Sequence, residues 1–263
     1  MDIKKPIIIA NWKMNFTAKE AEKTTTEILE LLAKEKINPQ EAEIILVPSF
    51  TALKSVAQLI KKTGIKIGTQ DCFWEEKGSF TGEISPLDLK ELGVEYVIIG
   101  HSERRKNLAE TDEMIHKKMA AALKTNLVPV LCVGETFEER QKGIKDYKIM
   151  NQITCALEGI KIKKEDRLII AYEPVWVIGS GQAMAPEEAR YINQVIKQRM
   201  VDLIGSALVE ETVSFIYGGS VDENNIKNFM QCEIGGILCE AGVLVGGASL
   251  KADQFVNLIK GIL

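Results

Sequence analysis

Short apolar runs recur along the chain, and segments of helical character separate them. Within each run the hydrophobic residues are largely continuous rather than alternating with polar ones. Strands that are buried on both faces have this composition, which is typical of a parallel sheet covered by helices. We therefore predict eight buried strands, at Ile7–Ala10, Ile44–Val47, Ile65–Gly68, Tyr96–Ile99, Val128–Cys132, Leu168–Tyr172, Ser214–Tyr217 and Val243–Val245.

The segments between these strands carry signals for the start of helices. Thr17 and Glu20 have the spacing of a capping box, in which the two side chains accept hydrogen bonds from each other's backbone N–H groups, and Thr136 and Glu139 share that spacing. Pro186 precedes two glutamates, which favours a first helical turn because proline needs no donor there and acids complement the helix dipole. Strands and helices are therefore expected to alternate.

Eight strand–helix units in 263 residues match a closed (β/α)8 barrel, which typically spans roughly 250 residues. An open doubly wound sheet needs fewer strands, and a dinucleotide-binding one would usually carry G-x-G-x-x-G after the first strand, which is absent here. No linker-like stretch or charge block divides the chain. We expect an α/β protein with a single barrel domain over residues 1–263.

The sixth predicted strand ends in a carboxylate, at the place where barrels carry their functional residues. Pro174 stops strand pairing directly after Glu173, and the apolar segment 175–178 closes with Gly179 to Gly181. This arrangement indicates a lid that shuts over a general base. Taken alone, Glu173 would more often be a buried ion-pair residue.

The first and fourth predicted strands also end in ionisable residues. Lys13 follows Asn11 directly after the first strand, where a partly buried ammonium needs an anionic partner. His101 ends the fourth strand and precedes a polar segment that can start a helix. Most lysines lie at the surface and most lone histidines are structural, so only the shared position at strand ends favours function. We interpret His116, inside a helical segment, as a surface or packing residue.

The last two predicted strands end in glycine pairs, Gly218–Gly219 before Ser220 and Gly246–Gly247. Backbone N–H groups after strands seven and eight form the usual phosphate site of barrels. A tight turn would explain either pair alone, and only their joint position favours phosphate binding.

The composition of the chain argues against several classes of binding partner. The chain is 46% hydrophobic and 27% charged with a net charge of -4, and its basic residues are scattered, which argues against nucleic acid or an anionic membrane as a partner. Five cysteines without a CxxC pair and two histidines argue against a disulfide framework and a metal site. The N-terminal segment has no signal-peptide core, so we expect a cytoplasmic protein.

Taken together, the strand-end segments closely resemble the triosephosphate isomerase family, in the family's order and along nearly the whole chain. The matching segments are Ala10–Asn15, Ile99–Arg105, Ala171–Trp176, Tyr217–Val221 and Leu244–Ser249. The resemblance implies a single-domain TIM barrel. It also implies interconversion of dihydroxyacetone phosphate and D-glyceraldehyde 3-phosphate through an enediolate, without a cofactor or a metal.

The residue roles come from this resemblance. Glu173 would be the base that moves a proton between adjacent carbons, and neutral His101 would donate to the carbonyl oxygens. Lys13 would supply positive charge, Asn11 would help to polarise the substrate, and Glu103 would support the array. Phosphate would be bound through backbone N–H groups at Gly179, Ser220, Gly246 and Gly247.

The segment Gly68–Glu83 resembles the family's interdigitating dimer loop, which implies a homodimer. Thr81 is the position expected to reach toward the partner's active site. We interpret Phe73, Trp74 and Phe80 as rings that need a partner to cover them. A mobile surface loop is the alternative interpretation of this segment.

Three segments depart from the family pattern. The lid ends in Gln182–Met184 in place of a Lys-Thr-Ala type hinge, Asp71 stands where asparagine is frequent, and Gln231–Glu240 is longer than usual. Two alternatives to the isomerase remain open: another phosphate-binding barrel enzyme, such as an aldolase, and a barrel without catalytic activity. An aldolase would need a Schiff-base lysine at a late strand end, and none is evident.

Overall fold

The computed structural model describes residues 5–177, 184–230, 233–234, 237–238 and 241–263. Eight parallel strands close into a barrel in the order β1-β10-β7-β6-β5-β4-β3-β2. The barrel strands are β1 (Ile7–Asn11), β2 (Glu43–Val47), β3 (Lys66–Thr69), β4 (Tyr96–Ile99), β5 (Val128–Val133), β6 (Leu168–Tyr172), β7 (Val213–Tyr217) and β10 (Gly242–Val245). The predicted (β/α)8 barrel is confirmed, with a strand at each of the eight predicted places.

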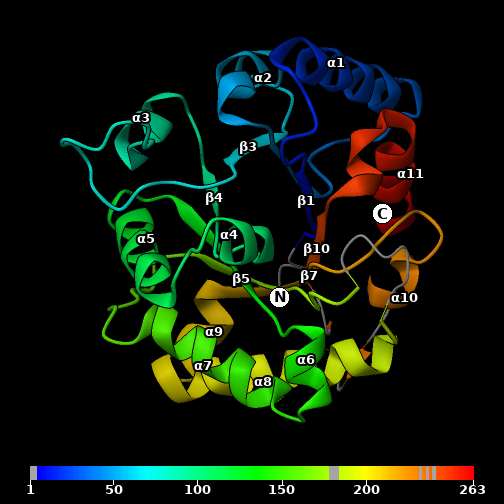
Figure 1. Ribbon diagram of the computed structural model, residues 1–263. Helices are drawn as coiled ribbons and strands as arrows, with labels where there is room; N and C mark the ends of the chain where they lie inside the picture. Colours follow the sequence, from blue (N-terminus) through cyan, green and yellow to red (C-terminus); the bar gives the residue numbers. More distant parts are fainter. Residues whose placement is uncertain (1–4, 178–183, 231–232, 235–236, 239–240) are drawn as a thin grey trace.

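Helices surround the barrel and connect its strands (Figure 1). The α-helices are α1 (Ala18–Lys34), α2 (Leu53–Leu59), α3 (Pro86–Glu91), α4 (Ser102–Asn107), α5 (Asp112–Lys124), α6 (Phe137–Gln141), α7 (Lys145–Leu157), α8 (Pro186–Ile204), α9 (Ser206–Thr212), α10 (Ile226–Met230) and α11 (Ala252–Ile262). Two short 3-10 helices are η1 (Phe50–Ala52) and η2 (Gly247–Leu250). None of the helices in the described part of the chain is long and apolar enough to cross a membrane.

The predicted helix starts are confirmed. Thr17 and Glu20 form a complete capping box at α1, and Thr136 and Glu139 form a second one at α6. Helix α8 begins at Pro186 with two glutamates in its first turn. These local hydrogen bonds satisfy backbone donors that would otherwise lack partners, so each connection turns into its helix at a defined residue.

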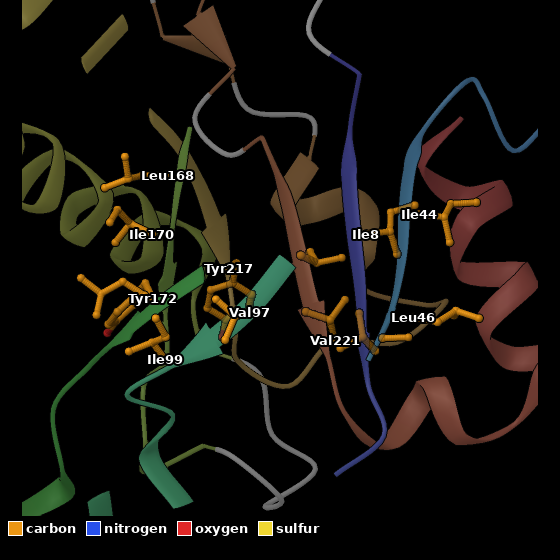
Figure 2. Close-up of a cluster of buried hydrophobic side chains, with 14 of the residues drawn as sticks. Ile8, Ile44, Leu46, Val97, Ile99, Leu168, Ile170, Tyr172, Tyr217 and Val221 are labelled. Atoms are coloured by element: carbon orange, nitrogen blue, oxygen red, sulfur yellow. The ribbon is translucent and has the colours of Figure 1, made fainter. Parts of the chain in front are cut away.

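The core has two layers because successive strand residues point to opposite faces of the barrel wall. Ile7 and Ile9 belong to the cluster that fills the barrel interior. Ile8 faces outward into the larger cluster between strands and helices, with Ile44 and Leu46 from the neighbouring strand (Figure 2). Figure 2 also shows Leu168, Ile170 and Tyr172 of β6 along that outer layer. Burial on both faces explains why the strands are continuously apolar.

All neighbouring barrel strands pair in parallel, so their C-terminal ends gather at one end of the barrel. For example, Ile8 pairs with Ile44 in β2 and with Val243 in β10. The predicted long segment before the last strand contains a separate antiparallel pair, β8 (Glu233–Ile234) and β9 (Ile237–Leu238). The parallel register therefore places the residues that follow each barrel strand around a common opening.

The segment of residues 70–85 between β3 and α3 extends away from the barrel (Figure 1). Its rings pack on one another: the ring centroids of Phe73 and Trp74 are 4.0 Å apart, and those of Phe73 and Phe80 are 4.7 Å apart. Phe73 is buried within the chain, whereas Phe80 is 43% exposed. The interpretation that all three rings need a partner is therefore wrong for Phe73, because Trp74 and Phe80 already cover it.

A buried ion cluster anchors the start of the segment 70–85. Lys118 on α5 is 2% exposed, and its Nζ lies 2.7 Å from Asp71 Oδ1 and in contact with Glu110 Oε1. Arg104 on α4 completes the cluster, with Nη2 2.7 Å from Asp71 Oδ2 and Nε 3.0 Å from Glu110 Oε1. Two cations and two carboxylates thus balance within the protein. Asp71 is a buried ion-pair partner, which gives the departure from asparagine a structural explanation.

Candidate active site

The sequence-predicted residues lie at the C-terminal ends of the barrel strands. Asn11 ends β1 and Lys13 follows it, His101 follows β4, and Glu173 follows β6. Ser220 follows β7, and Gly246 and Gly247 follow β10. Gly179, together with Gln182 and Ala183 of the hinge, lies outside the described residues. A direct series of contacts joins Lys13, Glu103, His101 and Glu173.

Glu173 is a buried carboxylate, 2% exposed, that is held at one oxygen and open at the other. Its Oε2 accepts a 3.0 Å hydrogen bond from the backbone N–H of Ser102, in the first turn of α4. Its Oε1 accepts no hydrogen bond from the described residues, and His101 Nε2 lies 3.2 Å away. One oxygen is thus free to take a proton while the other fixes the side chain.

His101 is the N-cap residue of α4, and this position determines its tautomer. Its Nδ1 accepts a 3.2 Å hydrogen bond from the backbone N–H of Glu103, so Nδ1 carries no proton in this arrangement. The ring proton of the neutral imidazole then lies on Nε2, the atom that faces Glu173. His101 can therefore donate a hydrogen bond into the site from Nε2.

Lys13 is held in an unusual backbone conformation, with φ of 51°. Such left-handed conformations cost a non-glycine residue about 1–3 kcal/mol and persist where surrounding contacts impose them. Its N–H donates to Asn11 Oδ1 at 3.1 Å, and Gln70 Nε2 donates to its carbonyl oxygen at 2.7 Å. Its Nζ lies 2.6 Å from Glu103 Oε1. These contacts hold the ammonium beside Glu103, at the C-terminal ends of the barrel strands.

Two glycines leave room for the base. A Cβ atom added at Gly134 would lie 1.7 Å from the carbonyl oxygen of Glu173, and one added at Gly218 would lie 2.9 Å from Glu173 Cγ. Neither distance is compatible with a side chain. The buried amide of Gln152 on α7 secures Gly134 through hydrogen bonds of 2.8 and 3.0 Å to its N–H and carbonyl oxygen. Glu173 therefore lies directly against the backbone of the neighbouring strand ends.

Glu135 is a site residue that the sequence reasoning missed. Its fully buried carboxylate accepts hydrogen bonds from Trp176 Nε1 at 2.9 Å and from the Tyr172 hydroxyl at 3.2 Å. Burial raises its pKa, and those two donors and Arg140 act in the opposite direction. Its position just after the fifth strand could have identified Glu135 as a strand-end residue in the sequence. Glu135 connects the end of β5 with the segment that follows Glu173.

Cys132 also touches the site. Burial raises the pKa of its thiol well above the usual range, and the nearby Glu173 carboxylate acts in the same direction. The thiol is therefore a neutral packing group beside the base. In the described part of the chain no group of three His, Cys, Asp or Glu side chains is arranged to hold a metal ion.

The expected phosphate-binding residues share the same end of the barrel. A Cβ atom added at Gly246 would lie 3.7 Å from Lys13 Nζ, so the backbone after β10 borders the ammonium group. Gly247 starts η2 and is exposed, and Trp12 Nε1 donates to the carbonyl oxygen of Ser249 at 3.1 Å. Thr81 is exposed on the segment 70–85. The structure thus brings the charged residues together beside backbone that is open to an anion.

Comparison with known proteins gives consistent matches. The family model described as Triosephosphate isomerase matches residues 6–262. The chain is 43% identical over 258 residues to the triosephosphate isomerase of Caldanaerobacter subterraneus subsp. tengcongensis, covering 98% of this chain and 99% of that protein. It is 43% identical to that of Dictyoglomus turgidum, covering 98% and 100%. It is 40% identical to that of Clostridium tetani, covering 98% and 96%.

Proposed function

Since the chain belongs to the triosephosphate isomerase family, we propose that it interconverts dihydroxyacetone phosphate and D-glyceraldehyde 3-phosphate. The observation that carries the proposal is the pair of Glu173 and His101, with Oε1 and Nε2 3.2 Å apart. A base and a proton donor at this distance can act on neighbouring atoms of one small substrate. The full-length relationship to named isomerases supports the same reaction.

In this proposal Glu173 takes a proton from the carbon next to the substrate carbonyl. The electron pair moves onto the carbonyl oxygen to give an enediolate, and the Nε2 proton of His101 stabilises that oxygen. His101 then passes a proton to the former carbonyl oxygen and takes the proton of the neighbouring hydroxyl, whose carbon becomes the new carbonyl. The protonated Glu173 returns its proton to the former carbonyl carbon, which completes the exchange of aldose and ketose. The open Oε1 of Glu173 and the assigned tautomer of His101 fit these two roles.

Lys13 and the glycine-rich strand ends would bind the anionic parts of the substrate. The ammonium of Lys13 offsets the charge of the phosphate and the enediolate, and its ion pair with Glu103 holds it in place before substrate arrives. Asn11 helps to orient Lys13 through the hydrogen bond to its N–H. Backbone N–H groups at Ser220, Gly246 and Gly247, with Gly179, are the proposed phosphate ligands.

A coupled assay tests the function. Purified protein is given D-glyceraldehyde 3-phosphate, and dihydroxyacetone phosphate is followed through NADH oxidation by glycerol-3-phosphate dehydrogenase. We expect rapid turnover that survives dialysis against EDTA, because general acid–base chemistry needs no metal. An aldolase would oxidise no NADH here but would form a hexose bisphosphate once dihydroxyacetone phosphate is added as well, and an inactive barrel would give no product in either mixture. Either of these results would contradict the proposal.

We also propose that the protein is a cytoplasmic homodimer that docks through the segment 70–85. Two exposed apolar side chains would be covered by the partner. Phe80 of this segment is 43% exposed, and Met14, between β1 and α1, is 93% exposed. We expect sedimentation equilibrium to give twice the chain mass of 29.2 kDa. Thr81→Arg should shift the protein toward monomer and lower kcat, because a charge would be buried in the interface.

Tyr147→Arg is the matched control for that experiment. Tyr147 is 66% exposed on α7, away from the segment 70–85, and its replacement should leave both the mass and kcat unchanged. A wild-type protein that sediments as an active monomer would contradict the dimer.

A further inference from the structure

Arg140 on α6 contacts three segments that are distant in sequence. Its guanidinium carbon lies 4.5 Å from the ring centroid of Trp176, and Nη1 lies 4.0 Å from Glu135 Oε1. Its two terminal nitrogens bind the two carboxylate oxygens of Glu188, in the first turn of α8, with Nη2 at 2.8 Å from Oε2. Arg140 therefore joins the loop after β5, the segment after β6 and the start of α8.

Trp176 is held on its face and on its edge. Arg140 covers the ring face, and Glu135 accepts the hydrogen bond of the indole Nε1–H at 2.9 Å. The backbone next to the ring is also fixed, because the N–H of Val175 donates to the carbonyl oxygen of Glu135 at 3.2 Å. Only two residues separate Trp176 from Glu173. A displacement of the indole would therefore be transmitted to the base.

Glu188 fixes Arg140 in turn. A planar guanidinium bound to both carboxylate oxygens has little rotational freedom, which a lysine ammonium cannot reproduce. Lys145 Nζ reaches Glu188 Oε1 at 2.8 Å from α7. Hydrogen bonding by Arg140 is the main cause that lowers the pKa of Glu188 to about 2, so the pair remains ionised at neutral pH.

We propose that Arg140 is a positioning residue for Glu173, in which the guanidinium held by Glu188 packs on Trp176 and fixes the segment 173–176. This inference rests on the proposed function, because it assigns Arg140 an effect on the base of that reaction. Reacting groups that are displaced by about 1 Å can lose on the order of 10²-fold in rate, so a small loosening is measurable. Three of the four proposed phosphate ligands, Ser220, Gly246 and Gly247, follow β7 and β10 and lie outside the segment 173–176.

The test compares variants of the full-length protein in the coupled assay. Arg140→Met should lower kcat by about 10-fold and change KM by less than about 3-fold, because the base is displaced while the phosphate ligands after β7 and β10 are unchanged. Arg140→Lys should give a smaller loss, because it keeps a charge for Glu188 but loses the planar stack. Lys145→Met is the matched control: it removes a cation from Glu188 without removing the guanidinium on Trp176, and kcat should stay within about 2-fold.

A double-mutant cycle separates positioning from a general effect on stability. If Arg140 acts through Trp176, then Arg140→Met should cost little further kcat in a Trp176→Leu background. Acrylamide quenching of tryptophan fluorescence should increase in Arg140→Met, because the ring face of Trp176 loses its cover. Arg140→Met should cause no such increase in the Trp176→Leu background. This measurement does not depend on turnover. Thermal unfolding by circular dichroism identifies any variant that fails to fold, and Arg140→Lys then carries the test.

The two hypotheses fail in different ways. Absence of isomerase turnover in the wild-type protein would overturn the proposed function. Normal wild-type turnover with unchanged kcat in both Arg140 variants, or fully multiplicative losses in the cycle, would overturn only the inference about Arg140.

Discussion

Replacing Glu173 with aspartate is expected to lower kcat by about 10²- to 10⁴-fold, the range that a positioned general base contributes. Aspartate is shorter by one methylene, so the carboxylate withdraws by about 1.5 Å from the substrate carbon. In the wild-type protein Oε2 is fixed by the N–H of Ser102 and Oε1 is open toward His101. The shorter side chain cannot keep both the hydrogen bond from Ser102 and the position beside His101. KM should change little, because the substitution leaves the backbone N–H groups of the proposed phosphate ligands in place.

The same experiment needs a control for folding and binding. Glu113→Asp makes the same chemical change on the exposed face of α5, in an ion pair with Lys117, and should leave kcat unaltered. Binding of 2-phosphoglycolate, a stable phosphate whose carboxylate mimics the planar enediolate, can be measured by calorimetry to show that the Asp variant retains an intact site. A Glu173→Asp protein with near-normal kcat would remove Glu173 as the base.

Replacing Lys118 with methionine is expected to destabilise the protein by about 3–5 kcal/mol, the cost of removing one partner from a buried ion pair. Lys118 is 2% exposed and binds both Asp71 and Glu110, so the substitution leaves two buried carboxylates with Arg104 alone. Urea unfolding followed by circular dichroism measures the loss. Lys117→Met is the adjacent control: its ion pair with Glu113 is exposed and should be worth less than about 1 kcal/mol.

The loss of stability caused by Lys118→Met should depend on pH. Burial raises the pKa of Asp71 to about 6, above its ordinary value of 3.8, although Lys118 and Arg104 act to lower it. A raised carboxyl pKa stabilises the fold at low pH, and that contribution disappears as the pH rises through about 6. Without Lys118 the pKa of Asp71 rises further, so the destabilisation should be larger at pH 8 than at pH 5.

Two results would contradict this account. One is a Lys118→Met protein within about 1 kcal/mol of the wild type at pH 8. The other is a failure of Asp71→Asn to recover part of the loss in the Lys118→Met background, since asparagine removes one of the two stranded charges.

The barrel could be predicted from the sequence because its signals are local. A strand such as Leu168–Tyr172 is buried on both faces, so every position is apolar, and this pattern does not depend on knowing its neighbours. The capping boxes at Thr17 and Thr136 act within four residues. Parallel pairing then requires that all strand ends share one opening, which is why Lys13, His101 and Glu173 could be grouped in advance.

Contacts between distant segments could not be predicted in the same way. Nothing near Gln70 in sequence indicates that it holds the carbonyl oxygen of Lys13, and Arg140 reads as an ordinary surface arginine. Phe73 suggested an uncovered surface, yet Trp74 and Phe80 pack against its ring. Each of these contacts depends on how two elements approach in space, and residue type alone does not specify that approach.

The sequence by itself determined the architecture, the strand-end positions of the charged residues and, through its resemblance, the family. The tertiary structure decided how those residues are prepared for chemistry. Only the folded chain shows that the N–H of Glu103 directs the proton of His101 to Nε2, and that the N–H of Ser102 fixes one oxygen of Glu173 while leaving the other open. The physical reason is that periodicity and capping are properties of neighbouring residues, whereas orientation and charge balance depend on atoms brought within about 3 Å by folding.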